Sequence, residues 1–413
     1  MSINLINTLA QPLKTAAKFV NHNEQASGLS TARFIQDTTT CLGPKAVFAR
    51  SKADLAENAF LEIAESCLVY LGPAFIGEKF SRRFFSKKLS QEAKKLVATP
   101  AVKLLEENNA ALNKVLPVKA AIALSALLIP LTEFTLNYFK NLMTLNIFHK
   151  SDFNNIVSLQ NEKEDKSFQD KVRKSAHKNI LKAGVIFLTS LAAGVVLAKK
   201  GEKSKLLQQF SEMILVPGTK FFKKNQKMKN FFNKYFSLDF ASQDGELVLS
   251  KGQLTSCVLI GGAGYFGASK DRGKQNFLET LFRFPLVGFY IITGSEPYEN
   301  AFKKLLIKLG KCKQIIDKNL EVPSFAKIEE LAKNLALKNG TTVENEFKKL
   351  AKQKVLISGF PFLFSIGFMG FFVAGVSNVF TRYRYDKDKE QQAQNNNFIA
   401  KKNYTPTFKQ FIA

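Results

Sequence analysis

A stretch of 27 residues near the end of the chain, Val355–Thr381, contains no charged side chain. Arg382 and Arg384 follow it. A helix of about twenty apolar residues crosses the hydrocarbon core of a bilayer, so this segment is long enough even when it tilts. A water-soluble protein would need a large core to enclose such a helix. The stretch therefore predicts a membrane-spanning helix.

Five weaker apolar segments precede this one. They lie at 59–77, 120–139, 183–198, 254–269 and 284–294. Each by itself is compatible with a buried helix of a soluble protein. The whole set predicts an all-α, multi-pass helical membrane protein with four to six embedded helices. The shorter segments could equally form re-entrant hairpins that turn back before the far side.

The stretch 41–62 resembles the stretch 257–279, which suggests an internal duplication. The shared positions are Gly43 with Gly261, Phe48 with Phe266, Ser51-Lys52 with Ser269-Lys270, and Phe60-Leu61-Glu62 with Phe277-Leu278-Glu279. Asn137 and Asn378, each late in an apolar segment, extend the parallel. Coincidence is the alternative, because chance matches are frequent in a chain rich in Lys and Phe.

A duplication would divide the chain into two membrane halves, 1–215 and 216–385. The remaining segment, 386–413, is polar, and we expect it to be disordered. Duplicated halves are common in transporters, where the site lies between the repeats near the middle of the membrane. They also occur in membrane proteins that transport nothing.

The chain carries a formal net charge of +26, which points to nucleic acid or to an anionic membrane surface. Only nine of its sixty basic residues are Arg, the residue preferred for contacts with bases and phosphates. Nucleic acid is therefore the weaker interpretation, and we expect the partner to be a lipid bilayer rich in anionic lipids. The four basic residues of the connector 270–283 would place that connector on the cytoplasmic side.

Between Lys220 and Phe240, pairs of Phe alternate with pairs of Lys at helical spacing. We predict one basic, aromatic, amphipathic helix, which suits the headgroup layer of an anionic membrane. Packing of its Phe face on the protein core is the alternative. The candidate lipid-surface contacts are Phe221, Phe222, Lys223, Lys224, Lys227, Phe231 and Phe232.

The first twenty residues lack the pattern of a cleavable signal peptide, because no apolar core follows a basic start. Ile6, Leu9, Leu13 and Val20 instead fall on one helical face. This pattern predicts an amphipathic helix that lies on the membrane or packs on the rest of the fold, and packing is the commoner case.

The run Gly262-Ala-Gly264-Tyr-Phe-Gly267 has the glycine spacing of a dinucleotide-binding turn. Such a turn needs a strand before it, an apolar helix after it and an acidic residue about twenty positions further on. Here the charged stretch ASKDRGKQN follows, and the later region reads LFRF. We therefore interpret the run as part of a membrane helix whose small residues let a neighbouring backbone approach closely.

Four carboxylates lie within or beside the apolar segments. A carboxylate that faces hydrocarbon costs a few kcal/mol, so each should face the bundle interior, an aqueous cavity or a basic partner. The candidate intramembrane polar site consists of Glu62, Glu65, Glu133 and Glu279. The alternative is that Glu62 and Glu65, which share a helix face, merely pair with Lys or Arg at the interface.

The sequence contains no recognisable arrangement of catalytic or metal-binding residues. The four cysteines are far apart, the three histidines have no neighbouring ligand, and no P-loop, HExxH or GxSxG motif occurs. We therefore expect no cofactor and no metal site, and a non-enzymatic role is favoured although an enzyme is not excluded.

The sequence thus predicts a membrane protein that organises or scaffolds the membrane through helix packing and contacts with anionic lipid. A transporter of small solutes or ions that uses the four carboxylates is the alternative. A soluble helical protein that binds nucleic acid through its lysines is the second alternative.

Overall fold

The computed structural model describes residues 5–25, 31–107, 111–243, 246–294 and 296–403. About 80% of it is helical, which confirms the all-α prediction. The strands found in this part of the chain are one short antiparallel pair, β1 (Ala241–Gln243) and β2 (Glu246–Val248).

Each apolar segment predicted from the sequence falls on a helix. The long helical stretches are, in chain order, α3 (Thr31–Val47), α4 (Lys52–Ile76) with its π-helical continuation η1 (Gly77–Phe85), α7 (Leu112–Ala126), α8 (Leu128–Phe148), α10 (Lys166–Lys200), α14 (Lys251–Ser256), η3 (Cys257–Gly261), α15 (Gly262–Asp271), α16 (Lys274–Thr293), α19 (Val343–Ser365), η4 (Ile366–Phe372) and α20 (Val373–Asn403). The shorter elements are α2 (Gln11–Gln25), α5 (Gln91–Leu96), α6 (Ala101–Glu106), α9 (Phe153–Ile156), η2 (Gly201–Lys203), α11 (Lys205–Leu215), α12 (Pro217–Phe221), α13 (Gln226–Tyr235), α17 (Glu296–Lys308) and α18 (Phe325–Asn339).

Four helical stretches of the described chain are long and apolar enough to cross a membrane: 52–85, 112–148, 166–203 and 343–395. The pair α16 and α17 makes a fifth if the two helices count as one span. In 112–148, 83% of the most apolar window is buried, against 17–22% in the other three. The stretch α7–α8 is therefore the central element, and most residues in the apolar windows of the other three are half-buried or exposed.

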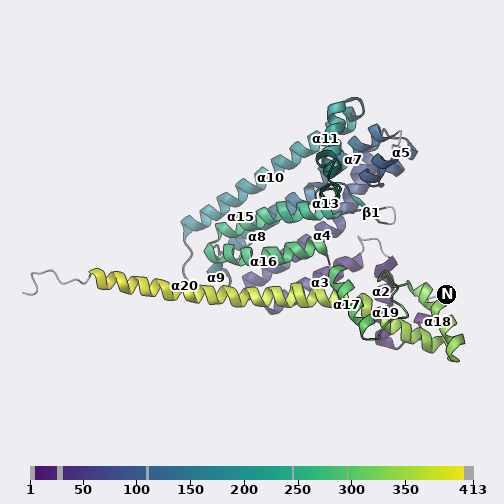
Figure 1. The fold of residues 1–413 in the computed structure, drawn as a ribbon. Coiled ribbons are helices and arrows are strands. Elements are labelled where there is room, and N and C mark those ends of the chain that lie inside the picture. Colours follow the sequence, from purple (N-terminus) through teal and green to yellow (C-terminus); the bar gives the residue numbers. More distant parts are fainter. Residues whose placement is uncertain (1–4, 26–30, 108–110, 244–245, 295, 404–413) are drawn as a thin grey trace, which may run out of the picture.

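The long helices run between two ends of the bundle, and α9 marks one of them (Figure 1). The turn between α3 and α4 meets α9 through Ser51, whose hydroxyl donates to the carbonyl of Ile156 at 2.5 Å. The turn between α15 and α16 meets α9 where the amide of Phe153 donates to the carbonyl of Arg272 at 3.2 Å. Both turns lie at this end, the α9 end, so α4 and α16 both run away from it.

The direction of the remaining helices follows from their contacts. α10 starts beside the α9 end, where Gln169 donates to the carbonyl of His149, and finishes at Gly201 against Pro117 near the start of α7. α20 returns to the α9 end, since Asp388 forms an ion pair with Lys274 at 2.9 Å. The chain therefore runs toward the α9 end in α3, α7–α8, α14–α15 and α19–α20, and away from it in α4, α10 and α16.

The amphipathic N-terminal segment packs on the protein. Ile6, Leu9, Ala17 and Val20 are buried in an apolar cluster that they share with α17, α18 and α19. This is the packing alternative rather than a helix that lies free on a surface. A larger apolar core surrounds α7 at the end of the bundle opposite α9.

The glycine run lies inside a continuous helix, as we predicted. A Cβ on Gly264 would come within 2.6 Å of the Cα of Phe134 in α8, and one on Gly267 would overlap the hydroxyl of Tyr138. Glycine therefore lets α15 and α8 approach at backbone distance. The residues directly before the run form the helices α14 and η3 rather than a strand, so the run is not a dinucleotide-binding turn.

Two other expectations differ from the structure. α20 continues as a helix through 386–403, where the composition indicated a disordered tail, and residues 404–413 lie outside the described residues. The region Lys220–Phe240 is not one helix, because α12 and α13 are separate helices. They pack together where the side-chain oxygen of Asn233 accepts from the amide of Gly218 at 2.8 Å.

Candidate functional site

A central cavity of about 390 Å³ lies between α3, α4, α8, η3–α15, α16 and η4. Its volume is within the range of pockets that hold small organic molecules. All four carboxylates predicted from the sequence line it, namely Glu62, Glu65, Glu133 and Glu279. Its other charged lining residues are Lys45, Arg50, Asp54, Glu57, Lys140 and Arg283.

The first of two buried ion clusters closes the cavity at the α9 end. Glu57 in α4 accepts two hydrogen bonds from the guanidinium of Arg272, at 3.0 and 2.5 Å. The hydroxyl of Thr144 in α8 donates to the same carboxylate at 2.5 Å. The side chain of Arg272 is fully buried and also donates to the amide oxygen of Asn141 at 3.1 Å. Such a pair is stable only because each of its members has several partners.

The second cluster contains the same residue types, but here the Arg comes from the first half of the chain and the Glu and Thr come from the second half. Glu279 in α16 accepts two hydrogen bonds from the guanidinium of Arg50, at 2.8 and 3.3 Å. The hydroxyl of Thr381 in α20 donates to this carboxylate at 2.8 Å, and Arg283 lies at 3.4 Å. Burial alone would lower the pKa of Arg50, but the carboxylates of Glu279 and Asp54 raise it overall, so the guanidinium keeps its charge.

The spacing of the two clusters along the chain is the same. Each Arg stands two residues before the first residue of α4 or α16, and each Glu stands five residues after it. Each Thr follows three residues after an Asn that donates to a backbone carbonyl of the other half. Asn141 donates to Ala268 at 3.0 Å, and Asn378 donates to Phe48 at 2.8 Å.

These contacts change the register of the suspected duplication. By geometry Glu279 corresponds to Glu57 rather than to Glu62, and Asn378 corresponds to Asn141 rather than to Asn137. The signals that sequence reasoning missed are the ungapped pairs RSKADLAE (50–57) with RGKQNFLE (272–279), and NLMT (141–144) with NVFT (378–381). The duplication itself stays a prediction.

Glu62, Glu65 and Glu133 lie further from the α9 end. Glu62 forms an ion pair with Lys45 of α3, which is the basic partner that the alternative interpretation required. Glu65 lies almost one turn further along α4. Glu133 accepts a hydrogen bond from the thiol of Cys257 and faces Gly261, where a Cβ would come within 2.7 Å of its Oε2. Glycine at 261 thus leaves room for the carboxylate.

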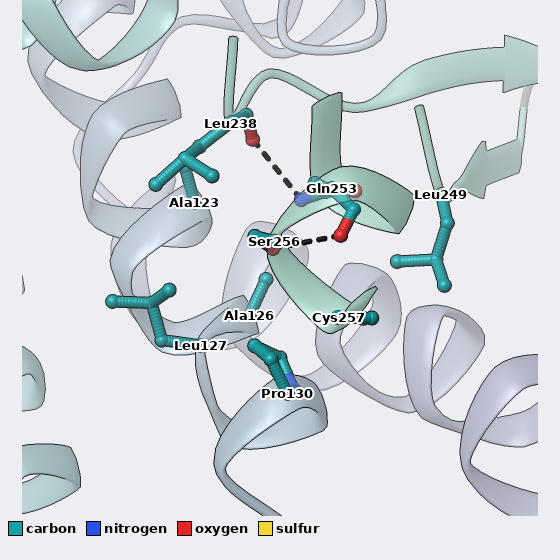
Figure 2. Close-up of a pocket in the computed structure, with 9 residues that line it drawn as sticks. All are labelled: Ala123, Ala126, Leu127, Pro130, Leu238, Leu249, Gln253, Ser256 and Cys257. Atoms are coloured by element: carbon teal, nitrogen blue, oxygen red, sulfur yellow. Dashed lines mark hydrogen bonds between the residues drawn. The ribbon is translucent and has the colours of Figure 1, made fainter. Parts of the chain in front are cut away.

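Figure 2 shows a second, much smaller cavity of about 10 Å³ where α14 and the start of η3 meet α7 and α8. It has room for no more than one water molecule and is therefore no ligand site. Beside it the side chain of Gln253 donates to the carbonyl of Leu238 at 3.0 Å, which fixes the start of α14 (Figure 2). Cys257 lines both cavities.

The candidate lipid-surface residues lie on the α12–α13 pair. Phe221 and Phe231 are about half exposed, and Phe222 and Phe232 are half-buried against each other at a ring-centroid distance of 4.5 Å. The side chains of Lys223, Lys224 and Lys227 are exposed. Their contact with lipid stays a prediction.

No protein-family model, no curated protein and no solved structure matches this chain. Within the described residues, no group of three or more His, Cys, Asp or Glu side chains is arranged to hold a metal ion.

Proposed function

We propose that this chain is an integral membrane protein that carries small solutes across the bilayer through its central cavity. The outward apolar surface of the long helices supports the membrane part of this proposal. On α10 alone, Leu181, Val185, Ile186 and Leu188 are more than half exposed. In water such an apolar surface would promote aggregation, whereas in a bilayer the acyl chains cover it.

The charged cavity is the observation that supports the proposal of solute transport. Ionised side chains cost free energy when they are placed within a membrane, and they usually mark a pathway for a substrate or ion. Helix packing and lipid contact alone would not require ten charged side chains around an internal space. We therefore place transport before membrane scaffolding, which the sequence suggested first.

The direction of the helices agrees with a carrier built from two halves. In this proposal the first half, α3, α4 and α7–α8, crosses three times, and the second, α14–α15, α16 and α19–α20, also crosses three times. α3 and α14–α15 are not among the stretches that are long and apolar enough by themselves, and α16 qualifies only together with α17, so these helices would cross as parts of the bundle. After three crossings the chain is on the opposite side, and α10 returns it, so the second half has the same orientation as the first. Parallel repeats of this kind are related by an axis along the membrane normal, and rocking between them gives alternating access.

Lysines indicate the orientation once the two ends are known. The connectors opposite the α9 end, 77–111 and 201–250, each carry eight Lys or Arg. At the α9 end, 149–165 carries two, the start of α10 (166–178) five, and the part of α20 after Thr381 (382–389) four. The positive-inside rule then places the α9 end outside. This reverses the local indication from 270–283, whose Arg272 and Arg283 are bound inside the protein. In this orientation α12–α13 would face the anionic inner leaflet.

Substitution of Glu62 by Gln tests transport. The change should reduce solute flux into proteoliposomes at least about tenfold, because it removes a carboxylate charge from the cavity wall and breaks the ion pair with Lys45. Uptake would be measured for a panel of cationic, neutral and anionic solutes. Glu202→Gln, which removes a half-exposed carboxylate outside the cavity, should leave the flux unchanged. Uptake that never exceeds that of protein-free vesicles, or that is the same with Gln at 62, would contradict the proposal.

A further inference from the structure

We infer that the cavity binds a small organic acid, whose carboxylate lies between Lys140 of α8 and Arg283 of α16. This inference rests on the proposed function, for which it names the class of solute. It is carried by a buried ammonium group without an acceptor, by a guanidinium that uses few of its donors, and by an excess of positive charge at the α9 end of the cavity.

Lys140 presents a buried ammonium group to the cavity. The residue is 5% exposed and lines the cavity. Its Nζ lies over the ring of Tyr265, 5.5 Å from the ring centre, and forms no hydrogen bond or ion pair within the described residues. This nitrogen is not one of the enclosed side-chain atoms that lack both a partner and accessible surface, so it stays open to the space that the residue lines. A ring face attracts the charge but offers no oxygen to the three N–H donors.

The carboxylates that attract Lys140 already have other partners. These carboxylates are Glu57 and Asp54. Glu57 accepts hydrogen bonds from Arg272 and from Thr144, and Asp54 accepts from Arg50. The charge of Lys140 therefore has no anion in contact with it in the described structure. A buried ammonium group in this position is costly unless a ligand supplies the missing acceptor.

The guanidinium of Arg283 also has unused donors. Its one hydrogen bond in the described structure is to Glu279 at 3.4 Å, and Arg50 holds that carboxylate more closely, at 2.8 Å. A guanidinium carries five N–H donors and can bind a carboxylate through two parallel bonds. Arg283 lines the cavity and interacts electrostatically with Lys140 and with Tyr265, so the two basic groups lie near each other. Together they offer a site to one carboxylate group.

The charges at the α9 end of the cavity do not balance. The acidic side chains there are Asp54, Glu57 and Glu279, and the basic ones are Arg50, Lys140, Arg272 and Arg283. Among the described residues that line this end or form ion pairs with its lining, one positive charge is thus in excess. A carboxylate would neutralise this excess, whereas a cation would increase it.

The remaining wall favours an acid with a single charge and an apolar body. Val287 and Ile291 follow Arg283 at intervals of four residues and also line the cavity, so an apolar stripe on α16 leads away from the carboxylate site. Glu133 lies seven residues before Lys140, about 10 Å along α8, and would repel a second acidic group. The cavity of about 390 Å³ is also far larger than an inorganic anion such as chloride requires.

Binding of matched probes to the purified full chain in nanodiscs tests the inference. Phenylacetate, 2-phenylethanol and phenethylammonium have similar shapes and differ in charge. We expect phenylacetate to bind at least about tenfold more tightly than the alcohol, measured by calorimetry, and phenethylammonium to bind weakest. Lys140→Met, and independently Arg283→Gln, should remove this preference without changing the affinity for the alcohol. Lys178→Met, which removes an exposed lysine of α10, should keep the preference, and size-exclusion profiles would verify that each variant is folded.

Equal affinity for the acid and the alcohol would overturn the inference, and so would a preference that survives both substitutions. Chloride binding that requires Lys140 and is not displaced by phenylacetate would identify an inorganic-ion site and would also overturn it. Binding does not need translocation, so the two proposals can fail separately. A preference for the acid that requires Lys140 but occurs without flux rejects the carrier, whereas Glu62-dependent flux confined to neutral or cationic solutes rejects the carboxylate site.

Discussion

Substitution of Arg272 by Met should lower the free energy of unfolding by about 3–5 kcal/mol, because it leaves the buried carboxylate of Glu57 without its guanidinium partner. Glu57 is 7% exposed and would keep the hydroxyl of Thr144 and the nearby charge of Lys140, but would lose both hydrogen bonds from the guanidinium. Unfolding in mixed detergent micelles, followed by circular dichroism, would measure the change. The α9 end would be affected most, since the carbonyl of Arg272 also fixes α9.

Two further variants give this prediction its controls. Arg82→Gln removes an exposed ion pair with Glu78 and should change stability by less than about 1 kcal/mol. Arg272→Met combined with Glu57→Leu should recover most of the loss, because a buried ion pair can be replaced by apolar side chains of similar size. A loss as small as that of Arg82→Gln would show that Arg272 and Glu57 are not paired in a buried site.

Substitution of Gly264 by Val should separate α15 from α8 and cost about 3 kcal/mol or more. Even the Cβ would come within 2.6 Å of the Cα of Phe134, and no change of rotamer relieves a clash with backbone. The loss would be measured as a lower midpoint of thermal unfolding in detergent, together with reduced yield of monodisperse protein.

Gly184 is the matched control for this substitution, because it also lies in a long apolar helix but a Cβ there meets nothing within 4 Å. Gly184→Ala should be neutral or stabilising by up to about 1 kcal/mol, since Ala is the better helix former. Equal tolerance of both substitutions would mean that α15 and α8 do not approach at backbone distance.

The helices and the site carboxylates were predictable because their signals are local. The absence of charge over 27 residues identifies Val355–Thr381 as an apolar helix. A carboxylate within an apolar segment is just as easy to recognise, and all four that we selected, Glu62, Glu65, Glu133 and Glu279, line the cavity. The packing role of Gly264 followed from the charged residues after it, which exclude a nucleotide-binding helix.

The basic half of the site was not predictable in the same way. Arg50 and Arg272 stand in polar turns, where a basic residue is ordinary, and only the fold brings them to Glu279 and Glu57 across more than two hundred positions. The correct register of the two halves was missed because the contiguous match Phe-Leu-Glu, at 60–62 and 277–279, was preferred. The match that starts at each Arg has its identical residues at separated positions. α13 starts anew at Asn225, whose side chain caps it, and Asn233 holds α12 against α13; helical periodicity does not register such single polar side chains.

Accessibility of single cysteines in intact cells tests the central claim, that two halves of equal orientation cross a bilayer. In a chain whose four native cysteines are replaced by Ser, Cys would be introduced singly at Ser158, Lys270, Lys87 or Lys224, all of which are exposed. A membrane-impermeant thiol reagent should label 158 and 270 from outside, and 87 and 224 only after the cells are opened. Labelling of 158 and 270 from opposite sides, or release of the chain from membranes by alkaline carbonate, would contradict the account.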